Sequence, residues 1–219
     1  MSKTSNAYGL TDKFWTSLDD KSRALYDDVR PLRSASYVVQ YPIYRIEQVL
    51  EEIHEDAQGQ GGELDLNPDF QRGHVWNQDK QIAFVEAIMR GTAPMVIRFN
   101  SPGWNGKEQR GDLNPYDVLC VDGLQRITAM REFMAGKFQV FGKYSVDDLE
   151  ETPFSFKRIG MNWTLEMFDI PNRADLLQFY LDLNAGGVVH SAEELERVGD
   201  LLEKAKNKPK QEKPKKPSP

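Results

Sequence analysis

The stretch YDVLCVDGLQRITAMREF, residues 116–133, reads as a buried strand, a tight turn and a helix. Its apolar run ends before Asp122-Gly123, which turns the chain, and a helical pattern begins close to Gln125. A glycine at such a turn lets the backbone approach a ligand, and free N–H groups at a helix start attract anions. Arg126 adds a planar guanidinium that suits phosphate oxygens. The stretch predicts a phosphate site; a plain turn with a solvated Arg126 is the alternative.

A second segment, NPDFQRGHVW at residues 67–76, combines charged residues with large aromatic ones. We expect Phe70 and Trp76 to anchor this segment to the core, because large aromatic side chains bury the most surface. Gln71 and Arg72 would then face a cleft shared with the turn described above. The alternative is a charged surface loop that carries two core aromatics.

Hydrophobic periodicity predicts helices and strands that alternate at irregular intervals. An N-terminal amphipathic helix is expected over 12–29, and Asn77 caps a later helix that Gly91 ends. Ser191 and Glu194 form a capping box for a last helix that runs into the tail. The expected helices are 12–29, 44–55, 78–90, 125–134 and 173–183, and the expected strands are 37–41, 95–99, 116–121, 138–141 and 164–170. This order favours a small α+β (mixed α/β) fold over a regular Rossmann fold.

Length and composition fit a single domain of ordinary size with appendages. The chain has 219 residues, of which 39% are hydrophobic, and a mean hydropathy of −0.61. No run approaches the roughly 20 apolar residues that a membrane span needs, and the N-terminus lacks a secretory signal pattern. The single cysteine, Cys120, forms no internal disulfide, and the three histidines lie far apart. We therefore expect a cytoplasmic protein with no membrane partner and no structural metal.

Charge is divided unevenly along the chain. Residues 203–219 hold seven lysines and two glutamates, a balance of +5, which leaves −11 for residues 1–202 out of the total of −6. The tail has no apolar face and is rich in lysine and proline, so it is expected to be disordered and to attract DNA or an acidic partner. A solubilising terminus is the alternative. The predicted division is an extension over 1–36, a domain over 37–202 and a tail over 203–219.

Taken together, the two segments resemble a known family, the ParB-like fold, and within it the N-terminal domain of GmrSD type IV restriction enzymes. The family pattern NPxFQRxxVW stands at residues 67–76, and hhDGQQRhxAhxxF stands as VDGLQRITAMREF at 121–133. One position departs from it, because Leu124 replaces the first glutamine of DGQQR. Three further motifs follow in the family's order: DKQIAFVEAIMRG at 79–91, APMVIRF at 93–99 and FYLDLNAGGVVHSAEE at 179–194. The resemblance covers about residues 37–200 and implies a small ParB/sulfiredoxin-like sheet surrounded by helices.

The resemblance also implies a nucleotide-binding cleft. Gln71 and Arg72 would face the phosphates from one side. The residues that would cradle the phosphates from the other side are Asp122, Gly123, Gln125 and Arg126. Glu86 matches the family's acidic position, as a base or metal ligand, although a solvated helix glutamate explains it equally. Asn184 and Gly186 would close the cleft or form an ordinary helix cap.

The function implied by the resemblance is NTP-dependent phosphoryl transfer or NTP hydrolysis linked to DNA modification, restriction or anti-restriction. The catalytic candidates are Asp122, Glu86 and Arg126, with ATP, CTP or GTP as the nucleotide and Mg²⁺ held by Asp122. A kinase for a hydroxymethylated base in DNA is one version. The alternatives are a non-catalytic, nucleotide-gated module that binds DNA or a protein partner and, third, a nuclease. A stand-alone domain of this kind suggests a phage-encoded protein in a host cytoplasm, with DNA reached through the cleft and the 203–219 tail.

Overall fold

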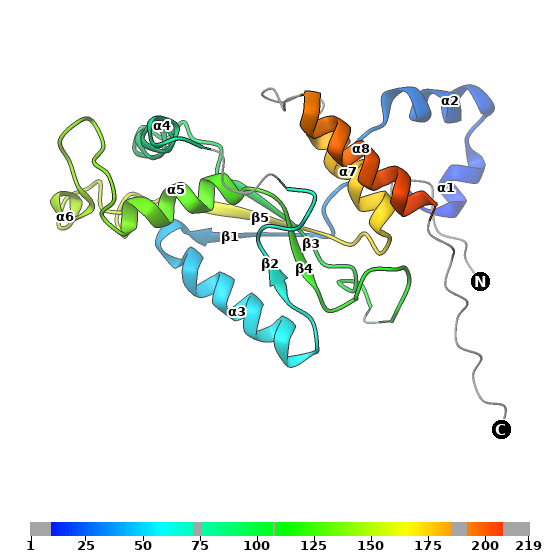
Figure 1. The fold of residues 1–219 in the computed structure, drawn as a ribbon, viewed down its shortest axis with the longest axis horizontal. Helices are drawn as coiled ribbons and strands as arrows, with labels where there is room; N and C mark the ends of the chain where they lie inside the picture. Colours follow the sequence, from blue (N-terminus) through cyan, green and yellow to red (C-terminus); the bar gives the residue numbers. More distant parts are fainter. Residues whose placement is uncertain (1–9, 72–75, 107, 185–191, 208–219) are drawn as a thin grey trace.

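A five-stranded mixed sheet lies at the centre of the protein, in the order β1-β5-β3-β4-β2 (Figure 1). This computed structural model describes residues 10–71, 76–106, 108–184 and 192–207. The strands are β1 (Tyr37–Pro42), β2 (Leu64–Asp65), β3 (Val96–Asn100), β4 (Val118–Asp122) and β5 (Asn162–Phe168). Strand β5 pairs antiparallel with β1 and parallel with β3, while β4 pairs antiparallel with β3 and parallel with β2. Together with the helices, this sheet confirms the predicted α+β class.

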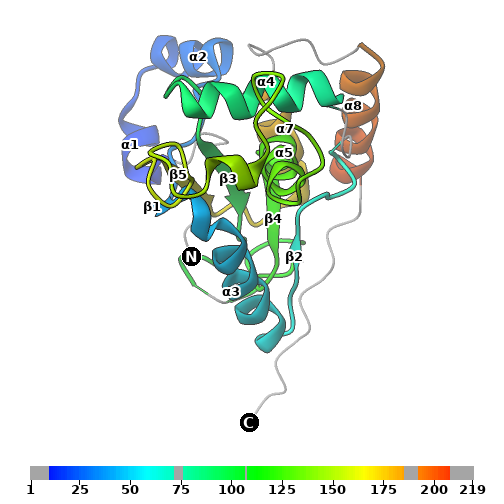
Figure 2. The ribbon, with the colours of Figure 1, turned by 90° about the vertical axis from the view of Figure 1, so that its left-hand side faces the viewer.

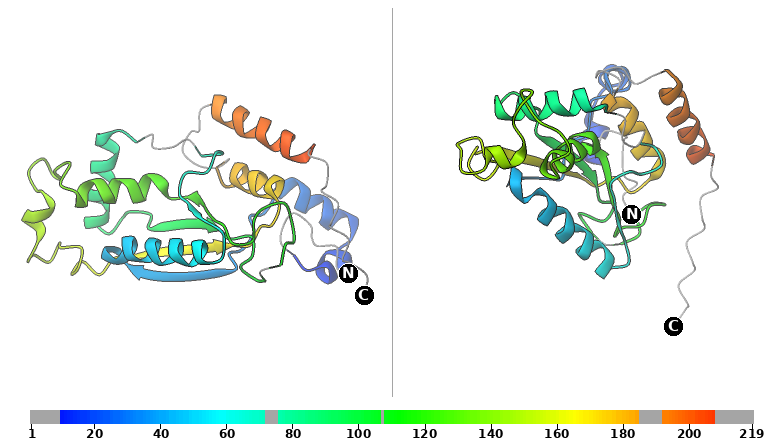
Figure 3. Two further views of the ribbon diagram at one scale, coloured as in Figure 1. Left: turned by 60° about the horizontal axis from the view of Figure 1, so that its bottom comes forward. Right: turned by 60° about the vertical axis from the view of Figure 1, so that its left-hand side comes forward.

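Each face of the sheet carries its own hydrophobic cluster. In β4, Val118 and Cys120 belong to the first cluster and Leu119 and Val121 to the second, because alternate side chains of a strand point to opposite faces. Helices α3 (Ile46–Gly59), α4 (Gln78–Met89) and α5 (Leu124–Met134) contribute to the first cluster, and α7 (Arg173–Asn184) and α8 (Ala192–Lys206) to the second. Figures 1 and 3 show α3 on one side of the sheet and α7 with α8 on the other.

The helices next to the two predicted site segments begin and end close to the predicted residues. Asn77 caps α4 by accepting a hydrogen bond from the Lys80 N–H at 3.1 Å, as expected. Gly91 follows α4 with a positive φ of 72°, which glycine adopts without strain. Helix α5 begins one residue earlier than predicted, at Leu124. Figure 2 shows α4 running across the end of α5.

The N-terminal segment forms two helices where one was predicted. Helix α1 (Asp12–Ser17) ends before Leu18, which is extended, and α2 (Asp20–Val29) starts afresh. The reason is local: the Asp19 side chain accepts a hydrogen bond from the Ser22 N–H and caps the second helix. Neither helix has a buried residue, so apolar periodicity there did not signal a continuous packed face.

The prediction of a strand over 138–141 was wrong. Only an isolated bridge between Val140 and Tyr144 forms, and the chain reverses at Phe141 and Gly142, whose φ values are 51° and 70°. Phe138 and Val140 are nevertheless buried in the first cluster. A tight turn thus produced the same alternation of buried and exposed residues as a strand. The short helix α6 (Val146–Leu149) follows.

Helix α8 continues past the predicted domain boundary at residue 202 and ends at Lys206. The capping residue Ser191 and the lysine-rich segment from residue 208 lie outside the described residues. Within the described part of the chain, no helix is both long and apolar enough to cross a membrane.

Candidate functional site

Four charged side chains of alternating sign lie side by side across the sheet, and we call them the charged row: Arg126, Asp122, Arg98 and Glu166. The strand register places Arg98 of β3 opposite Asp122 of β4 and Glu166 of β5. Its guanidinium lies 2.8 Å from an oxygen of each carboxylate. Arg126, in the first turn of α5, brings Nη2 to 2.5 Å from Asp122 Oδ2. The row therefore joins the end of β4 and the start of α5 to β3 and, through Arg98, to β5.

Gly123 fixes the position of the turn that carries the row. Its φ of 119° lies in a region that L side chains rarely adopt, and a Cβ there would lie 3.1 Å from both Cγ atoms of Ile97. The turn consequently approaches β3 closely. As the N-cap of α5, Gly123 supplies no side chain to the first N–H groups of the helix. These amides remain suited to an anion.

Arg126 is the least satisfied polar group of the row. Its side chain is only 14% exposed, and Nε and Nη2 are buried without a hydrogen-bond partner among the described residues. The short contact of Nη2 with Asp122 is an ion pair that lacks hydrogen-bond geometry. Buried hydrogen-bond donors almost always have acceptors. A buried donor without one at the start of a helix is therefore suited to an acceptor from a ligand.

The segment over residues 67–76 is anchored by its aromatics, as predicted. Phe70 is fully buried against Tyr180 at 5.2 Å between ring centroids, and Trp76 packs on Phe84 at 5.4 Å. The Gln71 amide donates to the main-chain carbonyl of Cys120 at 2.6 Å. The structure thus brings Gln71 against β4, two residues before Asp122, while Arg72 lies outside the described residues.

Gln125 links the same segment to α5. Its Oε1 accepts a hydrogen bond from the Trp76 N–H at 3.1 Å. Gln71 and Gln125 therefore tie the loop to β4 and to the start of α5. The structure brings both predicted glutamines to the turn at Gly123, where each side chain forms a hydrogen bond with a main-chain group.

Two arginines that sequence reasoning missed hold the loop from the opposite side. Arg197 of α8 donates to the main-chain carbonyls of Asp69, Phe70 and Gln71 at 2.7, 2.9 and 3.3 Å. Arg173 of α7 binds both carboxylate oxygens of Asp69, at 2.8 and 2.6 Å. These contacts join residues more than 100 positions apart in the chain. No local sequence pattern reports them. Arg98 and Glu166 were missed for the same reason.

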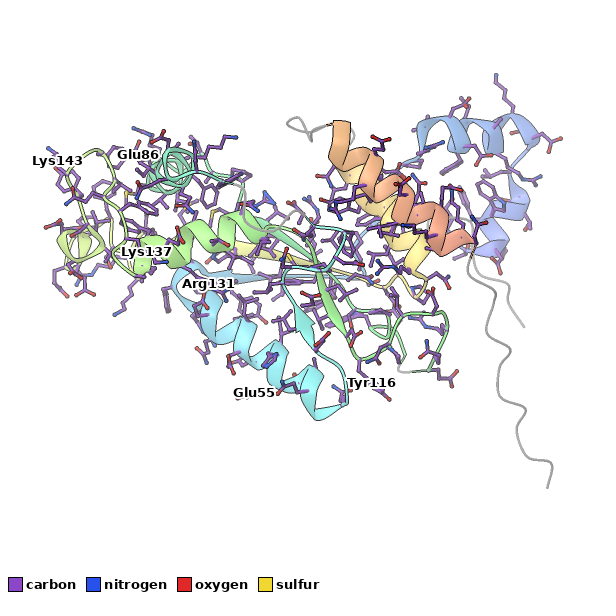
Figure 4. All side chains as sticks on the ribbon, viewed as in Figure 1. Glu55, Glu86, Tyr116, Arg131, Lys137 and Lys143 are labelled. Carbon is purple, nitrogen blue, oxygen red and sulfur yellow. The ribbon has the colours of Figure 1, made fainter. Side chains whose placement is uncertain are left out.

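Glu86, predicted as a catalytic group, lies in different surroundings. Its Oε1 accepts a hydrogen bond from the Phe141 N–H at 2.6 Å, and its Oε2 lies 3.4 Å from Arg90. Figure 4 shows it on α4, beside the loop that carries Lys143. In the described structure no contact joins Glu86 to the charged row. Asn184 donates to the Tyr180 carbonyl at 2.7 Å, within the last turn of α7.

Cys120 lies under the site and is buried in the first cluster, as predicted. Burial raises the pKa of its thiol to about 12, and the neighbouring Asp122 carboxylate acts in the same direction. A thiol in this state is neutral at physiological pH and does not serve as a nucleophile.

The described residues contain no group of three His, Cys, Asp or Glu side chains placed to hold a metal ion. The charged row offers Asp122, whose Oδ2 already faces two guanidinium groups. Mg²⁺ often binds through one or two carboxylates together with substrate phosphates. The residues present fit that mode, and not a site built entirely from protein ligands.

Fold and site define a small α+β protein with a candidate anion site between a strand end and a helix start. The chain belongs to the family of the GmrSD restriction endonuclease N-terminal domain, whose model matches residues 46–216. This match confirms the resemblance seen in the sequence and relates the protein to DNA restriction. No curated protein and no solved structure gives a significant match.

Proposed function

We propose that the protein binds a nucleoside triphosphate at the charged row and transfers or hydrolyses its terminal phosphate in a process linked to DNA. The observation that carries this proposal is the buried guanidinium of Arg126, whose Nε and Nη2 have no hydrogen-bond partner in the described structure. Phosphate oxygens are strong acceptors that match a guanidinium in charge and shape. A nucleotide would therefore give Nε an acceptor and share Nη2 with Asp122.

The turn at Gly123 supports the same placement. The N-cap residue of α5 offers its first N–H groups no side chain, although the Leu124 amide contacts the Cys120 thiol, and the positive end of the helix faces the turn. Arg98 and Arg126 lie on either side of Asp122 and would offset charge that develops on the transferring phosphate. Asp122 is the one row carboxylate beside both guanidinium groups, so it is the candidate to orient an attacking water or hydroxyl.

A divalent ion fits this proposal as a companion of the nucleotide. Mg²⁺ neutralises charge on phosphate oxygens when it is bound there. Asp122 is the residue that would hold it. Glu86 enters neither role in our proposal, because its carboxylate is engaged by the Phe141 N–H.

The link to DNA rests on the family and on the tail. The matched family is named for a restriction endonuclease, and residues 203–219 carry a charge of +5. DNA carrying hydroxymethylated bases offers a hydroxyl that a phosphotransferase could use as acceptor. ATP, CTP and GTP all remain candidates for the donor.

One observation favours a second candidate, a nucleotide-gated binding module without turnover. Asp122 Oδ2 already contacts two guanidinium groups, so this oxygen is engaged and is poorly placed to accept a proton from a water or hydroxyl. Leu124 also stands where the family motif has glutamine. The family name keeps a nuclease as a third candidate.

The test is to follow the labelled terminal phosphate of ATP, CTP and GTP with Mg²⁺, with plain DNA, with hydroxymethylated DNA and without DNA. Wild type is compared with Arg126→Ala and with Arg131→Ala, an exposed arginine of the same helix that pairs with Glu47. We expect turnover that falls at least tenfold in Arg126→Ala and persists in Arg131→Ala. Label on DNA would identify a kinase. Binding that depends on Arg126 without turnover would identify the gated module, and the absence of both would contradict the proposal.

A further inference from the structure

A cavity of about 300 Å³ opens beside the charged row, between the segment that leads into β1 and helix α7. Arg98 and Glu166 form its polar side, and Phe168 and Phe179 contribute aromatic walls. Arg33 also lines it, and a second hollow of about 230 Å³ shares Arg33 and Phe179. The hollow space therefore begins at the charged row and runs outward along α7. We call the 300 Å³ cavity the ring pocket.

The walls of the ring pocket combine flat apolar surfaces with a few polar groups. The rings of Phe168 and Phe179 lie 4.7 Å apart between centroids and are tilted by 47°. The remaining apolar walls come from Leu32, Ala35, Val38 and Leu183. Sites for small molecules have this composition and a volume of roughly 300–1,000 Å³. The pocket fits one small ring system better than a long chain.

The polar groups of the pocket offer both hydrogen-bond donors and an acceptor. Glu166 uses Oε2 to bind Arg98 at 2.8 Å, and no described residue donates to its Oε1. The guanidinium of Arg33 also lines the pocket, and burial lowers its pKa although Asp175 and Asp169 act against this. A heterocycle that carries both N–H and carbonyl or ring-nitrogen groups is complementary to such a set.

We propose that the ring pocket binds a nucleobase. The proposal rests on the proposed function in one respect: Arg98 belongs to both sites, so a base in the pocket and phosphates at the charged row can belong to one nucleotide. The base of a free nucleotide and a base of a DNA strand share this chemistry. The wall formed by residues 32–38 precedes the family match at 46–216. This wall of the pocket thus lies outside the matched segment, while Arg98, Glu166 and the aromatic walls lie inside it.

The test is equilibrium binding of four probes to the full chain by calorimetry: nucleosides, the matching triphosphates, inorganic tripolyphosphate and a single-stranded oligonucleotide. Ser34→Trp and Val38→Trp fill the pocket from exposed positions. Gln40→Trp places the same side chain on β1 outside the pocket and serves as the control. Thermal melts establish which variants are folded, and either filling variant suffices.

We expect at least one nucleoside to bind, with a loss of tenfold or more in the filling variants and no loss in Gln40→Trp. Its triphosphate should bind at least tenfold more tightly than tripolyphosphate, whose affinity the filling variants leave unchanged. If no nucleoside bound, and the triphosphates and tripolyphosphate had equal affinities, the proposal that the ring pocket binds a nucleobase would be wrong. Nucleoside binding that persists while tripolyphosphate fails to bind would instead overturn the phosphate site alone. Filling variants that weaken the oligonucleotide but spare the triphosphates would assign the pocket to DNA.

Discussion

At the scale of single residues, the site depends on side chains and turns that have few substitutes. Gly123 allows the turn to lie against Ile97, and Arg126 joins the row from the first turn of α5. Their spacing, three residues apart, was visible in the sequence because the strand, the turn and the helix are contiguous. The charged partners Arg98 and Glu166 were not predictable, because they reach the row only through the pairing of β3 with β4 and β5.

Gly123→Ala should lower the free energy of unfolding by about 1–3 kcal/mol, since an alanine would adopt an unfavourable φ and its Cβ would press on Ile97. Gly91→Ala is the matched control, because its φ is 72° and open space surrounds its Cβ position. Urea unfolding of the two variants measures the difference. Equal losses would mean that the contact with Ile97 carries no weight.

Cys120 should be inert in the folded protein and should make stability fall at high pH. Its pKa is raised from 9.0 to about 12, so the unfolded thiol ionises first and wild type loses stability as pH rises from about 9 towards 12. Below pH 9 this contribution is fully present. The difference in unfolding free energy between wild type and Cys120→Ala should be constant below pH 9 and shift against wild type above it. Rapid alkylation of the native thiol at pH 8 would contradict this account.

At the scale of elements, the helices that carry strong local signals were predictable. Asn77, Gly91 and the glycine turn at residue 123 specify α4 and α5 within one or two residues. The failures have local causes as well. Asp19 caps a new helix inside an apolar pattern, and the turn at Phe141 buries alternate residues without forming a ladder.

Helix α8 should set the order of the loop that carries Gln71. Arg197→Gln removes charge-assisted bonds to three main-chain carbonyls, and we expect the amides of Gln71 and Trp76 to exchange at least tenfold faster with solvent. The affinity of the site for phosphate should fall in the same variant, because the loop that carries Gln71 is less ordered. Lys204→Gln, on an exposed part of the same helix, should change neither. Unchanged exchange in Arg197→Gln would show that the other contacts of the loop, those of Phe70, Gln71 and Arg173 among them, hold it without Arg197.

At the scale of the whole molecule, an acidic body adjoins a basic tail. The charge of +5 over residues 203–219 predicts that DNA binding weakens with salt, because lysines that contact phosphates release counterions. Deleting residues 208–219 preserves α8, which ends at Lys206 and buries Leu202. We expect the deletion to lower the affinity for plain DNA at least tenfold and to make the remaining binding less dependent on salt. If the deletion changed neither the DNA affinity nor its dependence on salt concentration, the DNA contact would lie on the folded domain.

The central claim is that the charged row binds phosphate groups through Arg126. The most direct measurement is calorimetric titration of ATP, CTP and GTP with Mg²⁺ into wild type, Arg126→Ala and Arg131→Ala. The account predicts that at least one nucleotide binds wild type and Arg131→Ala alike and binds Arg126→Ala at least tenfold more weakly. Equal affinity for all three proteins would contradict it.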